Sequence, residues 1–108
     1  IQNSPFPLVV MDLSFISLRK VLPQAWCFLE RGGKLISLVK QQFECSKKEA
    51  DLGKGVIREE EVQNRVLQEI KDFAKAQLKG CELFFEATAR PRGTEGNQEF
   101  FLAWSKKI

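Results

Sequence analysis

The chain has 108 residues, 44% of them hydrophobic and 29% charged, which is enough for one folded domain with an apolar core. Its 17 basic and 14 acidic residues give a formal net charge of +3, which favours anionic partners only weakly. The sequence contains no histidine, which excludes Ser-His and Cys-His nucleophiles within the chain and argues against a zinc site of the usual Cys/His kind. We therefore predict no metal site.

No apolar run approaches the roughly 18 residues that cross a membrane, and no signal-peptide pattern is present. Cys27, Cys45 and Cys81 are scattered and form no C-x-x-C pair, as is typical of thiols in a reducing cytosol. These features predict a soluble, cytoplasmic protein with no membrane partner. Because residue 1 is Ile rather than Met, we also expect the chain to be a piece of a longer protein.

The chain opens with a predicted strand and a predicted helix. Residues 8–11 are a continuous apolar run, which predicts a strand covered on both faces. Apolar residues at helical spacing between 21 and 29 predict a helix, with Ser17 as its cap. Pro23 lies inside this pattern, so either a short first turn ends before it or the main helix starts there.

A second strand follows the helix. Residues 31–33, Arg-Gly-Gly, are predicted to close the helix as a basic last turn and a glycine stop. Residues 35–39 predict a second buried strand that ends in Lys40. The succession of strand, helix and strand is typical of a parallel α/β sheet. Residues 44–57 are charged and contain two glycines, which predicts a surface loop.

The second half predicts a long helix and a hairpin. Apolar residues between 59 and 79 follow helical spacing, with acidic residues at the start and Lys-Gly at the end. Residues 81–89 and 99–104 predict two strands whose connection is too short for a crossover helix, so they should be antiparallel. The order β-α-β-α-β-β predicts an α/β fold with a parallel sheet and a terminal antiparallel hairpin.

Polar residues stand at the ends of three predicted strands. Asp12 and Lys40 each follow a strand, and Glu99 begins the last strand on the same side of the sheet, so we expect the three to converge. A lysine flanked by carboxylates is a candidate base, which must lose its proton before it acts. The alternative is that these residues only solvate the strand ends or pair with one another, as is common in α/β domains.

Two basic segments are candidates for binding RNA phosphates. The first contains Lys47, Lys48, Lys54 and Arg58, and the second contains Arg90 and Arg92 beside a glycine. Acidic residues are interspersed in the first segment (Glu44, Glu49 and Asp51), so a solvated surface loop is an alternative interpretation. The second segment is equally compatible with an ordinary turn.

Four segments resemble one protein family in the same order: LVVMDLSFISLRKVLP, GGKLISLVKQQFE, GKGVIREEEVQNRVLQEIKDF and GTEGNQEFFL. They are similar to the FtsJ-like methyltransferases, and most closely to the TlyA or hemolysin A subgroup. The resemblance implies the C-terminal half of a Rossmann-like domain that transfers a methyl group from S-adenosylmethionine to a ribose 2′-hydroxyl of ribosomal RNA. It also implies that residues 1–108 are a single partial domain, without the cofactor-binding half and the RNA-binding S4 domain of the subgroup.

The family is characterised by a Lys-Asp-Lys-Glu tetrad, of which the resemblance carries three members onto Asp12, Lys40 and Glu99 as catalytic residues. The first lysine has no counterpart, and Gln41 replaces the proline of the subgroup's usual VKPQFE. No glycine-rich motif of the cofactor-binding type follows a predicted strand. The cofactor-binding residues are therefore unknown, Asp12 being one candidate, and we expect the isolated chain to bind S-adenosylmethionine weakly or not at all and to be inactive.

Two other functions stay open at this point. The subgroup's older name implies a membrane-active hemolysin, although the sequence shows no strongly basic amphipathic helix. A chain that had lost catalysis would be an interaction module. The resemblance further implies that residues 8–11 lie in the middle of the family's sheet, so in this chain we expect them to form an exposed edge and to support a homodimer.

Overall fold

The computed structural model describes residues 6–13, 16–40, 43–44, 60–89 and 98–107. Along the chain the elements are β1 (Phe6–Met11), α1 (Leu18–Phe28), β2 (Leu29–Lys40), α3 (Glu60–Gln77), β3 (Cys81–Thr88) and β4 (Glu99–Lys106). The predicted α/β class and the β-α-β-α-β-β order are confirmed. The last strand is two residues longer than predicted, and the long helix two residues shorter at its C-terminal end.

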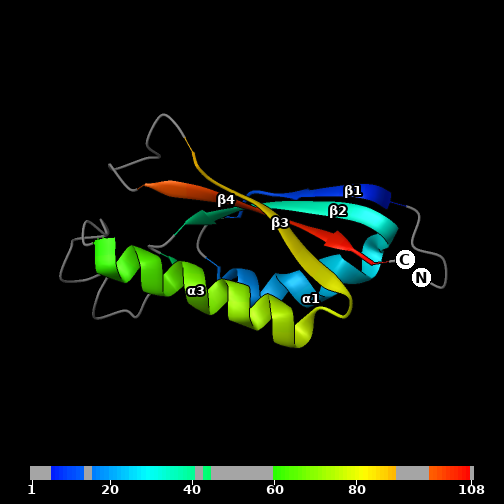
Figure 1. The fold of residues 1–108 in the computed structure, drawn as a ribbon, viewed down its shortest axis with the longest axis horizontal. Coiled ribbons are helices and arrows are strands. Elements are labelled where there is room, and N and C mark those ends of the chain that lie inside the picture. Colours follow the sequence, from blue (N-terminus) through cyan, green and yellow to red (C-terminus); the bar gives the residue numbers. More distant parts are fainter. Residues whose placement is uncertain (1–5, 14–15, 41–42, 45–59, 90–97, 108) are drawn as a thin grey trace.

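The strands form one sheet in the order β1-β2-β4-β3. β1 and β2 are parallel, whereas β4 runs antiparallel to both β2 and β3, so the predicted terminal hairpin is confirmed. Both helices lie on the same face of this sheet (Figure 1). β1 and β3 are the two edges of the described sheet.

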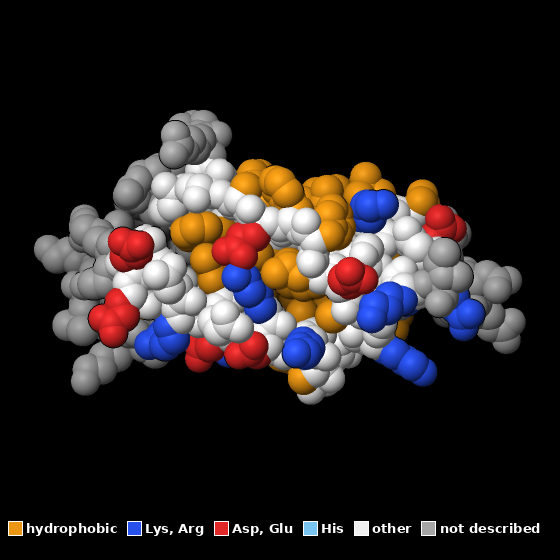
Figure 2. Space-filling model, in the orientation of Figure 1, with side chains coloured by type: hydrophobic (Ala, Val, Ile, Leu, Met, Phe, Trp, Pro, Cys, Tyr) orange, Lys and Arg blue, Asp and Glu red, His pale blue; other side chains and the backbone are white. Residues whose placement is uncertain are grey.

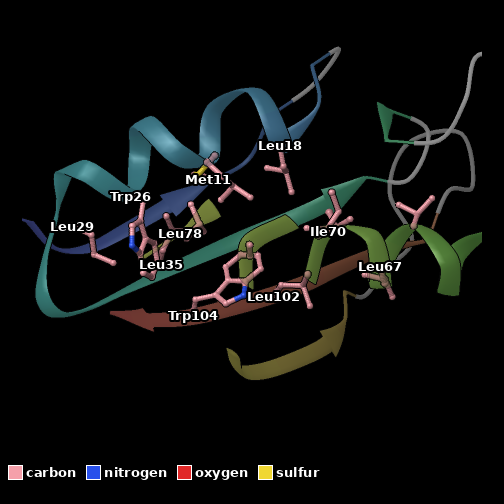
Figure 3. Packing of buried hydrophobic residues seen from close by; sticks show 14 residues of the cluster. Met11, Leu18, Trp26, Leu29, Leu35, Leu67, Ile70, Leu78, Leu102 and Trp104 are labelled. Carbon is pink, nitrogen blue, oxygen red and sulfur yellow. The ribbon is translucent and has the colours of Figure 1, made fainter. Parts of the chain in front are cut away.

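The hydrophobic core lies between the two helices and the sheet face that they cover. Alternate residues of a strand point to opposite faces, so every second residue of β2 and β4 reaches the helices. The helices contribute residues at intervals of three and four, which share one side of a helix. Figure 3 shows the packing; fully buried members include Leu22, Leu35, Val39, Val66, Ile70, Leu102 and Trp104.

α1 is one continuous helix of 11 residues that contains Pro23, so the predicted interruption or start at this proline is wrong. Proline has no N–H to donate to the carbonyl of Arg19, one turn earlier, and this loss weakens the helix. Leu22 and Trp26, on either side of the proline, are buried in the core. Tertiary packing of these two side chains holds the helix together where local propensity is poor.

The predicted glycine stop of α1 is also wrong. The helix ends at Phe28, and the next residue already begins β2, so Gly32 and Gly33 lie inside the strand. The register of β1 against β2 shifts between Phe6 and Leu8, opposite this segment. Gly32 has a φ of 83°, and a Cβ on Gly33 would stand 2.8 Å from a methyl carbon of the Leu29 side chain. The glycines therefore allow an irregular, tightly packed start of β2.

A lysine from β4 takes the place of the expected basic last turn. The Nζ atom of Lys106 donates hydrogen bonds to the carbonyl oxygens of Trp26, at 3.0 Å, and Leu29, at 2.8 Å. It also lies 5.7 Å from the centre of the Trp26 ring. A cation at the negative end of a helix is stabilising, and here it adds a second donor to the carbonyl of Trp26, which also accepts from the backbone N–H of Leu29.

The opposite face of the sheet carries exposed apolar side chains. Leu8 and Val10 in β1 are 52% and 67% exposed, so the prediction that this strand is covered on both faces is wrong for the described residues. Phe84 and Phe85 in β3 are about half exposed as well. Figure 2 shows hydrophobic side chains gathered over the strands. The helices thus bury one face of the sheet and leave the other open.

Candidate active site

Asp12 and Lys40 meet at one end of the sheet. Lys40 is the last residue of β2, and Asp12 directly follows β1. Because the two strands are parallel neighbours, their carboxyl ends lie side by side. The Nζ atom of Lys40 is 2.7 Å from Oδ1 of Asp12, which is the length of a strong charge-assisted hydrogen bond.

Glu99 stands next to Lys40 on the other side. It is the first residue of β4 and pairs with Lys40 in the antiparallel register. Directly opposite residues of such a pair point to the same face, with Cβ atoms about 4.5–5.5 Å apart. The three residues that sequence order places at strand ends therefore lie along one end of the sheet, with Lys40 between the two acids.

These residues point away from the helices. Val39 and Phe100, their neighbours along the strands, pack into the core, so alternation directs Lys40 and Glu99 to the helix-free face. The side chain of Lys40 is only 14% exposed, whereas that of Asp12 is 60% exposed. The lysine is thus held by the fold, and the aspartate is accessible. The ammonium group of Lys40 can donate a hydrogen bond to a substrate oxygen, and its unprotonated amine can accept a proton from that oxygen.

Glu44 lies close behind this cluster in the chain and is buried, at 9% exposed, so its predicted place in a solvated loop is wrong. One carboxylate oxygen accepts a hydrogen bond from the backbone N–H of Leu18, at 2.7 Å, and the other accepts from the hydroxyl of Ser17, at 2.6 Å. The first N–H groups of a helix have no partner within it, and the positive helix end favours a carboxylate. Glu44 therefore satisfies the start of α1 from 26 residues away.

The predicted cap at Ser17 is confirmed, since its Oγ accepts a hydrogen bond from the N–H of Arg19 at 3.1 Å. Burial raises the pKa of Glu44 above its ordinary value. The hydrogen bonds from Ser17 and Leu18 and the positive charge of Arg19 lower this pKa, but by less than burial raises it. The cost of burying this carboxylate therefore outweighs the gain from its partners. Sequence reasoning missed Glu44 because no local pattern links it to Ser17.

The basic residues predicted to bind RNA all lie outside the described residues; they are Lys47, Lys48, Lys54, Arg58, Arg90 and Arg92. Cys45 lies outside the described residues as well. Their role stays a prediction. In the described ranges, no group of three or more acidic or thiol side chains is placed to hold a metal ion. No helix in this part of the chain is both long and apolar enough to cross a membrane.

The sequence and the fold were compared with those of known proteins. No family model matches the chain. Over 95 residues, 88% of the chain, it is 37% identical to the 16S/23S rRNA (cytidine-2′-O)-methyltransferase TlyA of Mycobacterium tuberculosis. The chain resembles the TlyA-type rRNA methyltransferases. It is also 37% identical, over 93 residues, to the Bacillus subtilis protein named "Putative rRNA methyltransferase YqxC". This TlyA-like chain spans about a third of these relatives, 34% of TlyA and 32% of YqxC.

Solved structures agree with this resemblance. A protein titled "Putative hemolysin from Streptococcus thermophilus" superposes with a TM-score of 0.87 at 31% identity, over 98% of the TlyA-like chain and 37% of its own chain. TYW2 of M. jannaschii, solved in complex with AdoMet, superposes with a TM-score of 0.50 at 14% identity and shows the fold alone. The four-stranded α/β unit thus matches part of the fold of these two proteins.

Proposed function

We propose that the chain is part of an S-adenosylmethionine-dependent rRNA ribose 2′-O-methyltransferase that acts in the cytoplasm, and that Asp12, Lys40 and Glu99 serve the acceptor hydroxyl. The observation that carries this proposal is the 2.7 Å contact between Lys40 and Asp12 at the carboxyl ends of two parallel strands. Ligands of open α/β sheets bind at such ends. The similarity to TlyA supplies the substrate class, since that protein is named for cytidine 2′-O-methylation of rRNA.

In this proposal Lys40 contacts the reacting hydroxyl. Its ammonium group donates a hydrogen bond to the ribose oxygen and orients it, and its unprotonated form accepts the hydroxyl proton. Asp12 holds the lysine through the 2.7 Å contact, and Glu99 lies opposite the lysine in the β2–β4 ladder. A residue buried to 14% exposure has few positions open to it, so the orientation of Nζ is largely determined before RNA binds.

The described residues do not fit S-adenosylmethionine itself. Cofactor cradles of this fold class are glycine-rich turns that lead from a strand into a helix. The described glycines lie elsewhere: Gly32 and Gly33 are inside β2, and Gly80 precedes β3. We therefore propose that residues other than those described hold the cofactor, and that the 108-residue chain by itself binds it weakly and transfers no methyl group.

The proposal is tested with the full-length gene product that carries this chain. Purified protein is incubated with radiolabelled S-adenosylmethionine and unmethylated rRNA, and resistance of the labelled linkage to alkali shows whether the ribose 2′-oxygen is modified. Substitution Lys40→Met should reduce kcat by about 100-fold or more, as for loss of a general base. Lys107→Met, an exposed lysine beyond β4, is the matched control. A Lys40→Met enzyme with undiminished kcat would show that Lys40 is not the reacting group.

Calorimetric titration with S-adenosylmethionine separates the chain from the whole protein. We expect binding to the full-length gene product and little or none to the 108-residue chain. Equal affinity of both would place the cofactor site on this chain and overturn that part of the proposal.

A membrane-active function is the second candidate, because the solved structure from Streptococcus thermophilus carries the name hemolysin. The discriminating measurement is release of a dye from lipid vesicles by the full-length gene product. Leakage without rRNA methylation would favour the hemolysin. Methylation without leakage would favour the enzyme.

A further inference from the structure

Two contacts join the segment after β1 to the segment after β2. At the strand ends, Lys40 contacts Asp12. Four residues beyond Lys40, the carboxylate of Glu44 binds Ser17 and Leu18, which follow Asp12 by five and six residues. The described residues at the start and at the end of the two segments are therefore in contact, through Lys40–Asp12 and through Glu44.

The three members of the site are not held equally well. Lys40 and Glu99 pair with each other in the β2–β4 ladder, so the backbone of both is ordered by the sheet. The β1–β2 register ends one residue before Asp12, at the pair of Met11 and Ser37. Asp12 is also 60% exposed. The next described hydrogen bonds along the chain after Asp12 are those of Ser17 and Leu18 with Glu44.

A helix cap alone does not require Glu44. Ser17 already caps α1 by accepting a hydrogen bond from Arg19. An ionised carboxylate is a costly acceptor in a buried position, and the raised pKa of Glu44 shows that its burial is not fully compensated. A neutral acceptor would serve the N–H of Leu18 without the cost of burying a charge, and such departures from the rules of local structure are most common at functional sites.

We propose that Glu44 is a positioning residue, whose hydrogen bonds to Ser17 and Leu18 keep Asp12 in contact with Lys40. The proposal rests on the proposed function and extends it by one residue that no part of the tetrad includes. Glu44 does not touch the substrate, because its carboxylate is occupied at the start of α1. It acts through Asp12, and through Asp12 on the orientation of Lys40.

The test uses three variants of the full-length gene product. Glu44→Ala removes both hydrogen bonds. Glu44→Gln keeps them in neutral form, because its amide oxygen can accept from Leu18 and its amide nitrogen can donate to Ser17. Glu82→Ala is the matched control, since Glu82 is an exposed acid in β3 opposite Ser105, near the far end of the sheet.

Three quantities are measured on each variant: kcat and KM for rRNA methylation, the thermal unfolding midpoint, and the ¹H–¹⁵N signal of the Lys40 ammonium group in protein labelled at lysine. A lysine held against a carboxylate exchanges its protons with water slowly, so its signal is visible at mildly acidic pH and low temperature. The NMR signal reports on the contact with Asp12 without any need for catalysis.

We expect Glu44→Ala to lower kcat by up to about 100-fold, the loss that follows from a displacement of about 1 Å, with little change in KM. The Lys40 signal should broaden or vanish in the same variant. Glu44→Gln and Glu82→Ala should retain both the kcat and the signal of the unaltered protein. Rescue by glutamine separates positioning from a requirement for the negative charge.

A folded Glu44→Ala variant with unchanged kcat and an unchanged Lys40 signal would overturn the proposal. If that variant does not fold, Ser17→Ala takes its place, and it removes the bond to Glu44 together with the cap bond from Arg19. In its folded state, a lower kcat and a weaker Lys40 signal support positioning, and unchanged values overturn it. If the unaltered protein methylates no rRNA while the Lys40 signal responds as expected, the proposed function fails and the positioning role stands.

Discussion

Lys106 provides a direct test of how β4 is joined to the C-terminal end of α1 in the TlyA-like chain. Its Nζ atom donates hydrogen bonds to the carbonyl oxygens of Trp26 and Leu29, which lie 80 and 77 residues earlier in the sequence. Substitution Lys106→Met removes the charge and both hydrogen bonds and keeps an apolar chain of similar length over the Trp26 ring. We expect this substitution to destabilise the fold markedly.

The size of the effect follows from the contacts. Hydrogen bonds from a charged donor contribute about 1.5–3 kcal/mol, and a cation over a tryptophan ring contributes about 0.5–1 kcal/mol at a partly exposed site. These contributions share one charge and are not additive, and the methionine retains packing on Trp26. We therefore expect the free energy of unfolding to fall by about 2–3 kcal/mol. For a domain of this size, that loss lowers the unfolding midpoint by about 10–20 °C.

The assay is urea unfolding of the 108-residue chain, followed by tryptophan fluorescence, in parallel with Lys107→Met. Lys107 is an exposed neighbour whose backbone N–H, rather than its side chain, bonds to the carbonyl of Gly80. This control removes the same charge and should leave the free energy of unfolding almost unchanged. Equal stability of the two variants would refute the reasoning, because it would mean that the contacts of the Lys106 ammonium group contribute nothing.

Three further predictions concern Glu44, β1 and Gly33. The pKa of Glu44 is raised in the fold, so the folded state binds this proton more tightly than the unfolded state does. The stability that results is fully present below the ordinary pKa of 4.5 and is lost as pH rises through the folded pKa. The free energy of unfolding of Glu44→Gln minus that of the unaltered chain should therefore increase as pH rises above 4.5 in urea titrations; a decrease would contradict the burial of this carboxylate. We expect the exposed edge at β1 to cause self-association of the 108-residue chain. Val10→Lys should abolish this self-association in sedimentation experiments. An unaltered chain that stays monomeric at high concentration would argue against association through this edge. Gly33→Ala should cost about 1–3 kcal/mol of stability, because its new methyl group would stand 2.8 Å from the Leu29 side chain and 2.9 Å from the carbonyl oxygen of Glu30; an alanine variant as stable as the original would contradict that packing.

Much of the fold follows from local patterns. The helical spacing of residues 59–79 predicts α3 to within two residues at each end, and the short connection before Glu99 predicts the antiparallel hairpin. The prediction fails where packing opposes local preference. Pro23 remains inside α1 because its neighbours are buried, and Gly32 and Gly33 belong to a strand rather than to a helix end.

The sequence by itself determined the order of the elements and the places of Asp12, Lys40 and Glu99 at strand ends. Periodicity and turn residues act over a few positions, and the pairing rules of parallel strands then bring those ends together. Only the tertiary structure decided the partners of Glu44 and Lys106. Their hydrogen bonds join groups 26 to 80 residues apart. Such contacts depend on how helices pack on the sheet, which no local pattern records.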